Sequence, residues 1–346
     1  MLKKLSHLTA IIFAIHLSAC GGGSDSDDQN NQLSSANIEP SATTEKPIIP
    51  DFKPVTQTPS TQPSLSTPSV GQVYHIQPNV SNCVQGQLSL EAEQAVLKKL
   101  NEIRTLHGLQ AIVYDETHAE QMMRTALVMA ANRQLSHSPS NSWLCYSAEA
   151  NIGASTSNLY MISGTNLKED IAVLENDLVA WLIDEKVESS GHRRWLLDPF
   201  LTKVAYGSVS AIVSGQQVRA SSLKVIYNDQ NSTTAQQDVI AYPMGDYPKA
   251  YFKQNAYLSV SILGNTTSRF ANQNIDYSQA VIKIKPRGGQ AATIQSLSYN
   301  NDFMGLPNHL QFKLDQVKEN IIYDVHLDNV KVNNVPRRYD YWFQLK

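Results

Sequence analysis

The sequence predicts an α+β protein in which a helical part with a few strands is followed by an all-β part. Between residues 90 and 184, apolar residues recur three or four positions apart, as in amphipathic helices. After Pro199 the β-branched and aromatic residues typical of strands take over. The 346 residues are 42% hydrophobic and 17% charged, so the chain has enough apolar surface to form a core.

Three helices are predicted from this periodicity and from the residues that begin or end them. The first ends at Gly108, because glycine accepts the left-handed conformation that commonly terminates a helix. The second starts at Thr117 and Glu120, which have the spacing of a capping box. The third starts near Asn166 and ends near Asp184.

The strands are predicted from short β-branched and aromatic runs between turn residues. Two of them, 204–212 and 222–227, are joined by a turn at Ser214 and Gly215. After a polar run at 228–237, evenly spaced short strands predict a small all-β sandwich over residues 238–346. These strands are 256–263, 280–284, 310–314, 321–327 and 339–345.

The first residues predict export. Two lysines precede a short apolar stretch at 8–19, which is too short to span a membrane and is typical of a signal peptide over residues 1–19. Leu-Ser-Ala-Cys at 17–20 resembles the bacterial lipobox, which implies a diacylated Cys20 at the start of the mature chain. That resemblance, with Gly21 after the cysteine, implies a lipid anchor in the outer membrane or at the cell surface.

The segment after Cys20 predicts a tether. Seven of the fifteen prolines lie between residues 21 and 70, among Ser, Thr, Asn and Gln, and such a stretch buries too little to fold. We therefore expect a disordered linker over residues 20–80, a first domain at 81–230 and the β-sandwich at 238–346. The polar run before residue 238 indicates that the two domains fold independently.

The cysteines predict one disulfide bond. When Cys20 carries lipid, only Cys83 and Cys145 remain, and an exported chain with two cysteines has one internal pairing. The alternative is a pair of buried free thiols.

Charge and motifs exclude several classes of function. A formal charge of -3 gives no field that attracts phosphates, so nucleic acid is not an expected partner. The chain has no Walker loop, GxSxG elbow, HExxH or paired CxxC motif. Nucleotide use and covalent catalysis by a recognisable nucleophile are therefore disfavoured.

A series of motifs follows in a fixed order between residues 100 and 199. They are Leu-Asn-Glu-Ile-Arg at 100–104, His137, Glu-Ala-Asn at 149–151, Trp181, Gly-His-Arg at 191–193 and Leu-Asp-Pro at 197–199. In order and spacing they resemble the CAP superfamily of cysteine-rich secretory proteins, venom antigens and plant pathogenesis-related proteins, and its bacterial branch. The resemblance covers residues 88–228 and implies a three-layer α-β-α sandwich with a cleft lined by two histidines and two acids.

The resemblance assigns the cleft positions residue by residue. They are His137, Glu149, Asp184 and His192, with Glu185 and Glu188 as second choices for the second acid. Ala148 stands where the family motif has glycine, and Ala150 is inserted before Asn151, so the local turn departs from that of the family.

Four such groups are compatible with three roles. Neutral imidazoles and carboxylates bind a divalent metal such as zinc with a position left open. Without a metal, they form a structural tetrad with shifted pKa values. In the third role, catalysis, a carboxylate activates a water that the two histidines hold. Arg193 and Arg194, beside His192, are expected to lie outside while Trp195 packs inward.

Together these features predict a lipid-anchored CAP-domain protein of the bacterial cell envelope. It binds a ligand, or an envelope or host protein, through the His/acid cleft. One alternative is a metal-assisted hydrolase that acts on peptide or envelope material. Another is a structural adhesion module whose contact surface is the β-sandwich, since the segments 322–326 and 341–343 resemble the closing strands of immunoglobulin-like modules of bacterial surface proteins.

Overall fold

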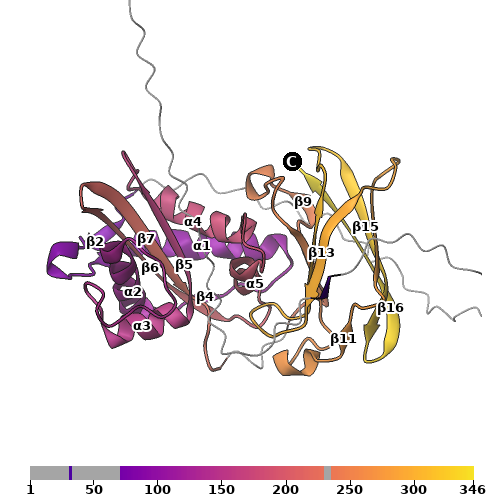
Figure 1. Ribbon diagram of the computed structural model, residues 1–346, viewed down its shortest axis with the longest axis horizontal. Helices are drawn as coiled ribbons and strands as arrows, with labels where there is room; N and C mark the ends of the chain where they lie inside the picture. The colour runs from indigo at the N-terminus through magenta and orange to yellow at the C-terminus, as the bar shows by residue number, and fades with distance from the viewer. Residues whose placement is uncertain (1–30, 33–70, 230–234) are drawn as a thin grey trace, which may run out of the picture.

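The computed structural model describes residues 31–32, 71–229 and 235–346, which form two units that pack side by side (Figure 1). The first unit combines helices and strands, and the second is built of strands with short helical turns. The α+β prediction is therefore confirmed. The predicted signal peptide, Cys20 and residues 21–30 and 33–70 of the predicted linker lie outside the described residues.

A four-stranded sheet forms the middle layer of the first unit. Its order is β4 (Val113–Tyr114), β6 (Lys203–Val213), β7 (Gln216–Lys224) and β5 (Ser157–Gly164). Strands β5, β7 and β6 are antiparallel, and β4 runs parallel to β6. The prediction that the strand after β6 begins at residue 222 is wrong, because β7 starts directly after the turn at Ser214 and Gly215, which both have positive φ. The first half of β7 was not predicted as a strand because it begins with polar side chains near the turn.

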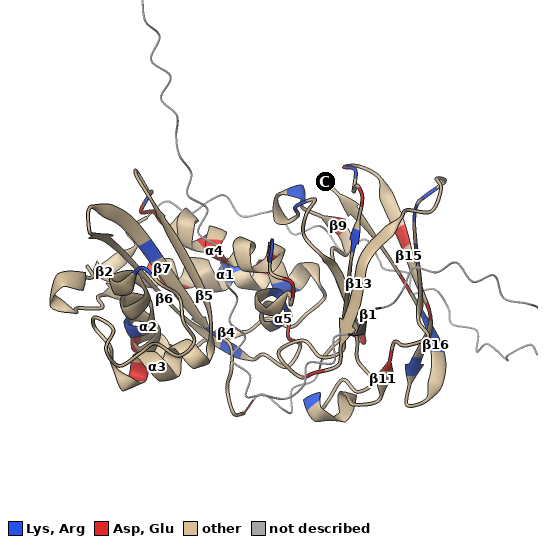
Figure 2. Cartoon of the chain, viewed as in Figure 1, with Lys and Arg blue, Asp and Glu red and all other residues tan. Residues whose placement is uncertain are grey.

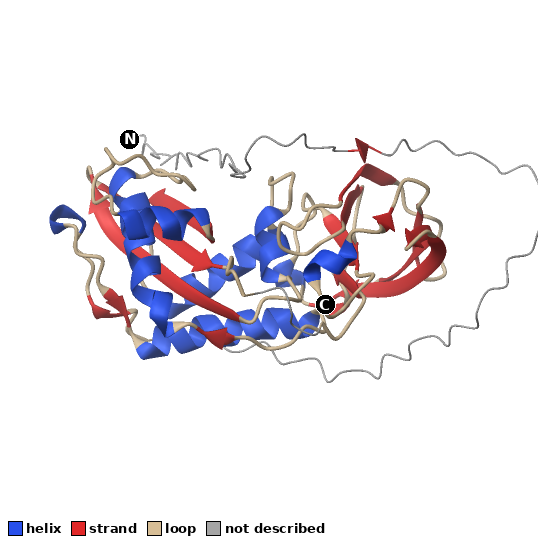
Figure 3. Cartoon of the chain, turned by 90° about the horizontal axis from the view of Figure 1, so that it is seen from below, coloured by secondary structure: helices blue, strands red, loops and turns tan. Residues whose placement is uncertain are grey.

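Helices cover both faces of this sheet, which gives three layers (Figure 3). On one face lie α2 (Ala119–Asn132) and α3 (Ala148–Ser155). On the other lie α1 (Leu90–Leu106), α4 (Ile171–Ile183) and α5 (Gly191–Leu196). A side chain at Gly207 of β6 would clash with the backbone of Met122, since its Cβ would lie 2.3 Å from the Met122 carbonyl carbon. Glycine there lets α2 rest directly on the sheet.

The structure corrects two predicted helix starts. The short helical turn η2 (Glu116–His118) precedes α2, and the Asp115 carboxylate accepts the Thr117 N–H at 3.2 Å. The capping box of Thr117 with Glu120 is therefore wrong, because Asp115 already takes the cap position. Helix α4 is capped by Asp170 rather than Asn166, since the Asp170 carboxylate accepts the Val173 N–H at 3.1 Å.

The first unit begins earlier along the chain than expected. Strand β2 (Tyr74–Ile76) pairs with β3 (Gln87–Leu88), and the helical turn η1 (Val80–Asn82) joins them. The buried Tyr74 hydroxyl accepts the Ser210 N–H at 3.0 Å, so residues expected in the linker contribute to the core. The predicted disulfide is confirmed, since Cys83 after η1 is bonded to Cys145 before α3.

The second unit is a sandwich of two sheets, as predicted. One sheet contains, in order, β1 (Asn31–Gln32), β13 (Ile294–Asn300), β14 (His309–Leu314), β10 (Leu258–Ile262) and β8 (Val239–Tyr242). The other contains β11 (Ile275–Asp276), β15 (Ile322–Val332), β16 (Val335–Leu345) and β9 (Gly245–Tyr247), with β12 (Val281–Pro286) also on β15. The turns η3 (Lys249–Tyr251) and η4 (Arg269–Asn272) complete the unit.

Three buried arginines bond across the boundary between the two units, namely Arg193, Arg194 and Arg269. The guanidinium of Arg193 donates to the carbonyls of Leu182 and Ile183 in the first unit and of Tyr257 in the second, at 2.7, 2.6 and 2.8 Å. The expectation that Arg193 and Arg194 lie outside is therefore wrong. Some of their acceptors, such as the carbonyls of Tyr257 and Leu306, belong to the second unit, which the local sequence cannot reveal.

A buried ion pair also crosses this boundary. The Arg269 guanidinium, in η4, contacts the carboxylate of Asp198, which has no exposed surface. Arg269 also donates to the Gly305 carbonyl at 2.7 Å. A Cβ at Gly305 would lie 2.7 Å from the carbonyl carbon of Arg194, so glycine lets the two units approach at that point. The independent folding of the two units stays a prediction. A unit expressed alone would lose the hydrogen bonds and the ion pair of this interface.

We predict that Arg269→Leu lowers the free energy of unfolding by about 3 to 5 kcal/mol, because it leaves the Asp198 carboxylate buried without its partner. Urea unfolding at pH 7 measures the loss. The control is Lys249→Leu, which removes an exposed pair with Glu319 and should change stability by less than about 1 kcal/mol. Equal losses in the two variants would contradict the prediction.

Candidate functional site

His192 and Asp184 form the centre of the candidate site. Asp184 follows the last residue of α4 and is buried, and His192 lies in the first turn of α5. The Nδ1 atom of His192 lies 2.7 Å from Oδ1 of Asp184. The other carboxylate oxygen accepts the Arg193 N–H at 3.2 Å. Asp184 therefore fixes both the ring of His192 and the backbone that carries it.

His137 is the second histidine, in the segment between α2 and α3. Its Nδ1 lies 2.7 Å from the carbonyl oxygen of Ala154, which requires Nδ1 to carry the hydrogen. Burial lowers the pKa of His137 below its usual value, and the charge of His192 lowers it further. The charge of His192 thus reaches the ring of His137.

A short junction between α3 and β5 connects the two histidine segments. The Ala154 carbonyl holds His137, and four residues later the amide of Asn158 donates to the His192 carbonyl at 3.1 Å. Between them, Thr156 Oγ1 accepts from the ammonium of Lys224 at 3.0 Å. The positions of both histidines therefore depend on residues 154–158.

The remaining predicted acids do not join this arrangement. Glu149 is exposed in the first turn of α3, where its own backbone N–H and the Ser147 hydroxyl lower its pKa. Glu185 is half-buried and Glu188 is exposed. Over residues 71–229 and 235–346, the side chains of these three glutamates make no hydrogen bond or ion pair with either histidine. Of the acids predicted for the cleft, the structure brings Asp184 to His192.

The described residues do not assemble a metal centre of their own. No group of three or more His, Cys, Asp or Glu in the described ranges is placed to hold a metal ion. Zinc sites in proteins ordinarily use three or four protein ligands. His137 and His192 supply two Nε2 atoms, so a protein-only zinc centre does not fit here.

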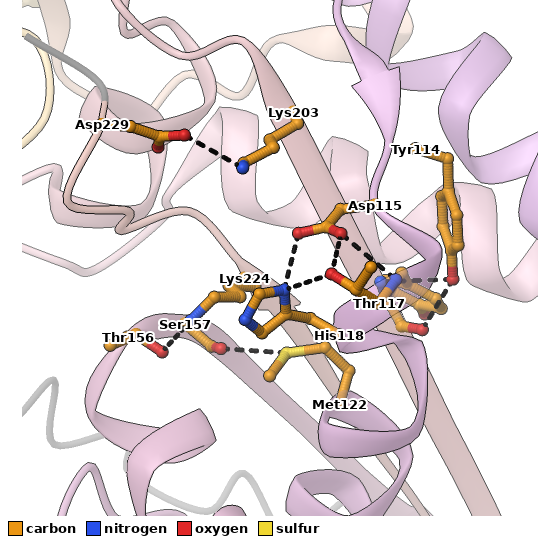
Figure 4. Close-up of polar contacts among 11 residues, drawn as sticks. Tyr114, Asp115, Thr117, His118, Met122, Thr156, Ser157, Lys203, Lys224 and Asp229 are labelled. Atoms are coloured by element: carbon orange, nitrogen blue, oxygen red, sulfur yellow. Dashed lines mark hydrogen bonds and ion pairs between the residues drawn. The ribbon is translucent and has the colours of Figure 1, made fainter.

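A second polar cluster, which the sequence did not indicate, lies beside the junction (Figure 4). Lys203 and Lys224 place their ammonium groups 4.8 and 5.0 Å from the ring centre of Tyr227. Burial, together with the charge of Lys203, lowers the pKa of Lys224. His118 Nδ1 lies 2.7 Å from the carboxylate of Asp115. Because Lys224 bonds Thr156, this cluster supports the junction from the α2 face of the sheet.

The sequence did not reveal three residues that contact the histidine segments. One contributes a backbone carbonyl, one lies in an unpredicted strand and one is far away in the sequence. The Ala154 carbonyl has no signal in a sequence, because any residue provides one. Asn158 lies in β5, a strand that the sequence did not predict. Gln311, which bonds the segment before His192, is separated from Ser190 by 121 positions.

We predict that His192→Asn raises the pKa of His137, because it removes a positive charge that opposes protonation of that ring. An NMR titration of the His137 ring protons measures the shift. His75→Asn is the control, since His75 is exposed and outside the site. If His137 titrates identically in the wild type and in His192→Asn, the two rings are not coupled.

Comparisons with known proteins bear on the first unit. Residues 97–212 match the family model of the cysteine-rich secretory protein family, CAP. No curated protein matches the chain. Among solved structures, an outer surface protein of Borrelia burgdorferi is similar, with 15% identity over 40% of this chain and 95% of its own and a TM-score of 0.26. A likeness that weak carries no argument about function.

The match spans α2, α3, α4 and α5, the helices that surround His137 and His192, together with the strands between them. The expected order of motifs and the three-layer architecture agree with it. Residues 97–212 therefore form a CAP domain.

Proposed function

We propose that this protein is an exported, lipid-anchored CAP-family protein that binds a ligand or partner through His137 and His192. One observation carries the proposal. Each ring has its Nδ1 occupied by a fixed acceptor, a carbonyl for His137 and a carboxylate for His192. The Nε2 atoms of both rings have no hydrogen-bond partner among the described residues, so they are available to a ligand.

This arrangement favours recognition. A ring whose Nδ1 donates to a fixed acceptor keeps one tautomer and one orientation, as histidines in binding and metal sites do. Neutral Nε2 atoms accept a hydrogen bond or ligate a cation, whereas protonated ones donate to an anion. A metal bound here would complete its coordination with water or with the ligand itself.

The alternatives have less support. A metal-assisted hydrolase needs a third metal ligand, and the described residues do not bring one to the two histidines. A general base role for the Asp184 and His192 pair needs a substrate or nucleophile within reach of Nε2. The adhesion alternative would use the β-sandwich, and no contact of the described residues favours that surface over the two histidines.

The proposed location rests on the sequence at residues 17–20. The described residues contain no helix long and apolar enough to cross a membrane. Lys, Arg, Asp and Glu are interspersed over both units (Figure 2), which gives no reason to propose nucleic acid as a partner. A diacylated Cys20 would hold the protein at the membrane through its buried methylene groups.

We predict that Zn²⁺, used as a probe, binds with one-to-one stoichiometry in calorimetry if the two Nε2 atoms face a common ligand. His137→Ala and His192→Ala should each abolish the heat, and His75→Ala should leave it unchanged. Affinity should fall at low pH because protons compete for the rings, and burial, which lowers the pKa of His137, moves protonation of that ring to lower pH. Absent heat, or heat that survives in both variants, would refute a shared binding site.

We predict that Cys20→Ala moves the protein from the detergent phase to the aqueous phase in detergent partitioning, because the acyl chains are lost. The matched control is Ser24→Ala, which lies after the lipidated position and should partition like the wild type. An unchanged membrane fraction for Cys20→Ala would rule out the anchor.

A further inference from the structure

The loop between α4 and α5 contacts both units of the protein. It starts at Asp184 and ends at Ser190, two residues before His192. Asp184, Lys186 and Ser190 have φ values of 53°, 67° and 49°, in the left-handed region that favours glycine. Such a backbone persists only when its surroundings hold it in place. The contacts that hold this loop therefore bear on the position of His192.

Gln311 of β14 supplies two of these contacts from the second unit. Its Oε1 accepts from the Ser190 hydroxyl at 2.8 Å, and its Nε2 donates to the Glu188 carbonyl. His309, two residues earlier on the same strand, contacts the same Oε1 through Nε2 at 3.3 Å. Gln311 is only 7% exposed, and its amide is held in one orientation by donors on one side and an acceptor on the other.

The residues after the loop are tied to the second unit as well. Arg193 donates to the Tyr257 carbonyl and to the Ser259 hydroxyl, at 2.8 and 3.3 Å. The Leu306 N–H donates to the Arg194 carbonyl at 2.9 Å. His192 lies between these anchors in the chain, and its ring bonds Asp184 of the first unit. The same short segment therefore both binds the β-sandwich and contributes to the candidate site.

We propose that Gln311 is a positioning residue for the His137 and His192 site. By holding the Glu188 carbonyl and the Ser190 hydroxyl, it keeps the loop in the conformation in which the Asp184 carboxylate meets the ring of His192. The β-sandwich is thus part of the site's support rather than a separate appendage. The consequence for ligand binding rests on the proposed function, whereas the effect on His192 does not.

The test compares Gln311→Ala with the wild type by NMR of ¹⁵N-histidine-labelled protein. Loss of both contacts should loosen the loop, so the Nδ1 proton of His192 should exchange faster with water and its signal should broaden. Zn²⁺ affinity should fall by about tenfold, the lower end of what supporting residues contribute to metal binding. The control Gln295→Ala removes a glutamine of the same unit that contacts Asp315 and not the first unit, and should change neither measurement.

A second variant covers the case in which Gln311→Ala does not fold. Ser190→Gly removes the hydroxyl that Gln311 binds, and glycine accepts a φ of 49° without strain, so the chain should stay folded. The Nδ1 proton of His192 should again exchange faster, while the melting temperature stays near that of the wild type. Unchanged exchange at His192 in a folded variant would overturn the proposal.

The two proposals fail in different ways. If the wild type gives no heat with Zn²⁺, the shared binding site is refuted, yet the exchange of the His192 Nδ1 proton still measures the action of Gln311. If Zn²⁺ binds and Gln311→Ala leaves both affinity and exchange unchanged, binding stands and the positioning role is refuted.

Discussion

The buried guanidinium of Arg193 is the group on which the arrangement of the two units depends. The last carbonyls of a helix have no partner within the helix, and Arg193 donates to two of them, those of Leu182 and Ile183 in α4. The same group donates to the second unit at Tyr257 and lies 3.8 Å from the ring centre of Tyr242. A cation removed from water needs all of these partners, because an unmatched one would cost several kcal/mol. The Arg193 side chain thus bonds the last carbonyls of α4, joins the two units and fixes the backbone next to His192.

The junction between α3 and β5 has a corresponding role on the other side of the site. It is bonded to His137 through the Ala154 carbonyl, to the His192 backbone through Asn158, and to Lys224 through Thr156. Lys224 is buried, so its ammonium group stays in place only while Thr156 and the Tyr227 ring face it. Both histidines are therefore held by backbone that is itself fixed by buried polar contacts, which limits how far either ring can move.

The sequence predicted those features whose signals lie within a few neighbouring residues, and it missed those that depend on contacts between distant residues. The cores of α1, α2 and α4 follow from apolar spacing, which depends only on residues within a few turns. The disulfide follows from counting cysteines. The sequence did not predict β5. It also placed the arginines of α5 outside, because several of their acceptors, such as Tyr257 and Leu306, lie 64 or more positions away. Asp198 and Arg269 are 71 positions apart, and no local pattern indicates that they meet. Resemblance to a family located the two histidines, but the support from Gln311 lies outside the matched residues 97–212.

The separation of Glu149 from the two histidines also has a local cause. Its carboxylate accepts a backbone N–H at the start of α3, where the helix dipole stabilises a negative charge and lowers the pKa of the acid. Bringing Glu149 to the histidines would give up that stabilisation. Asp184 is different, because it follows the end of α4 with a left-handed backbone and finds its stabilising partners in His192 and the Arg193 N–H. The candidate site therefore pairs two imidazoles with one contacting carboxylate, and no second acid of the described residues bonds Nε2 of either ring.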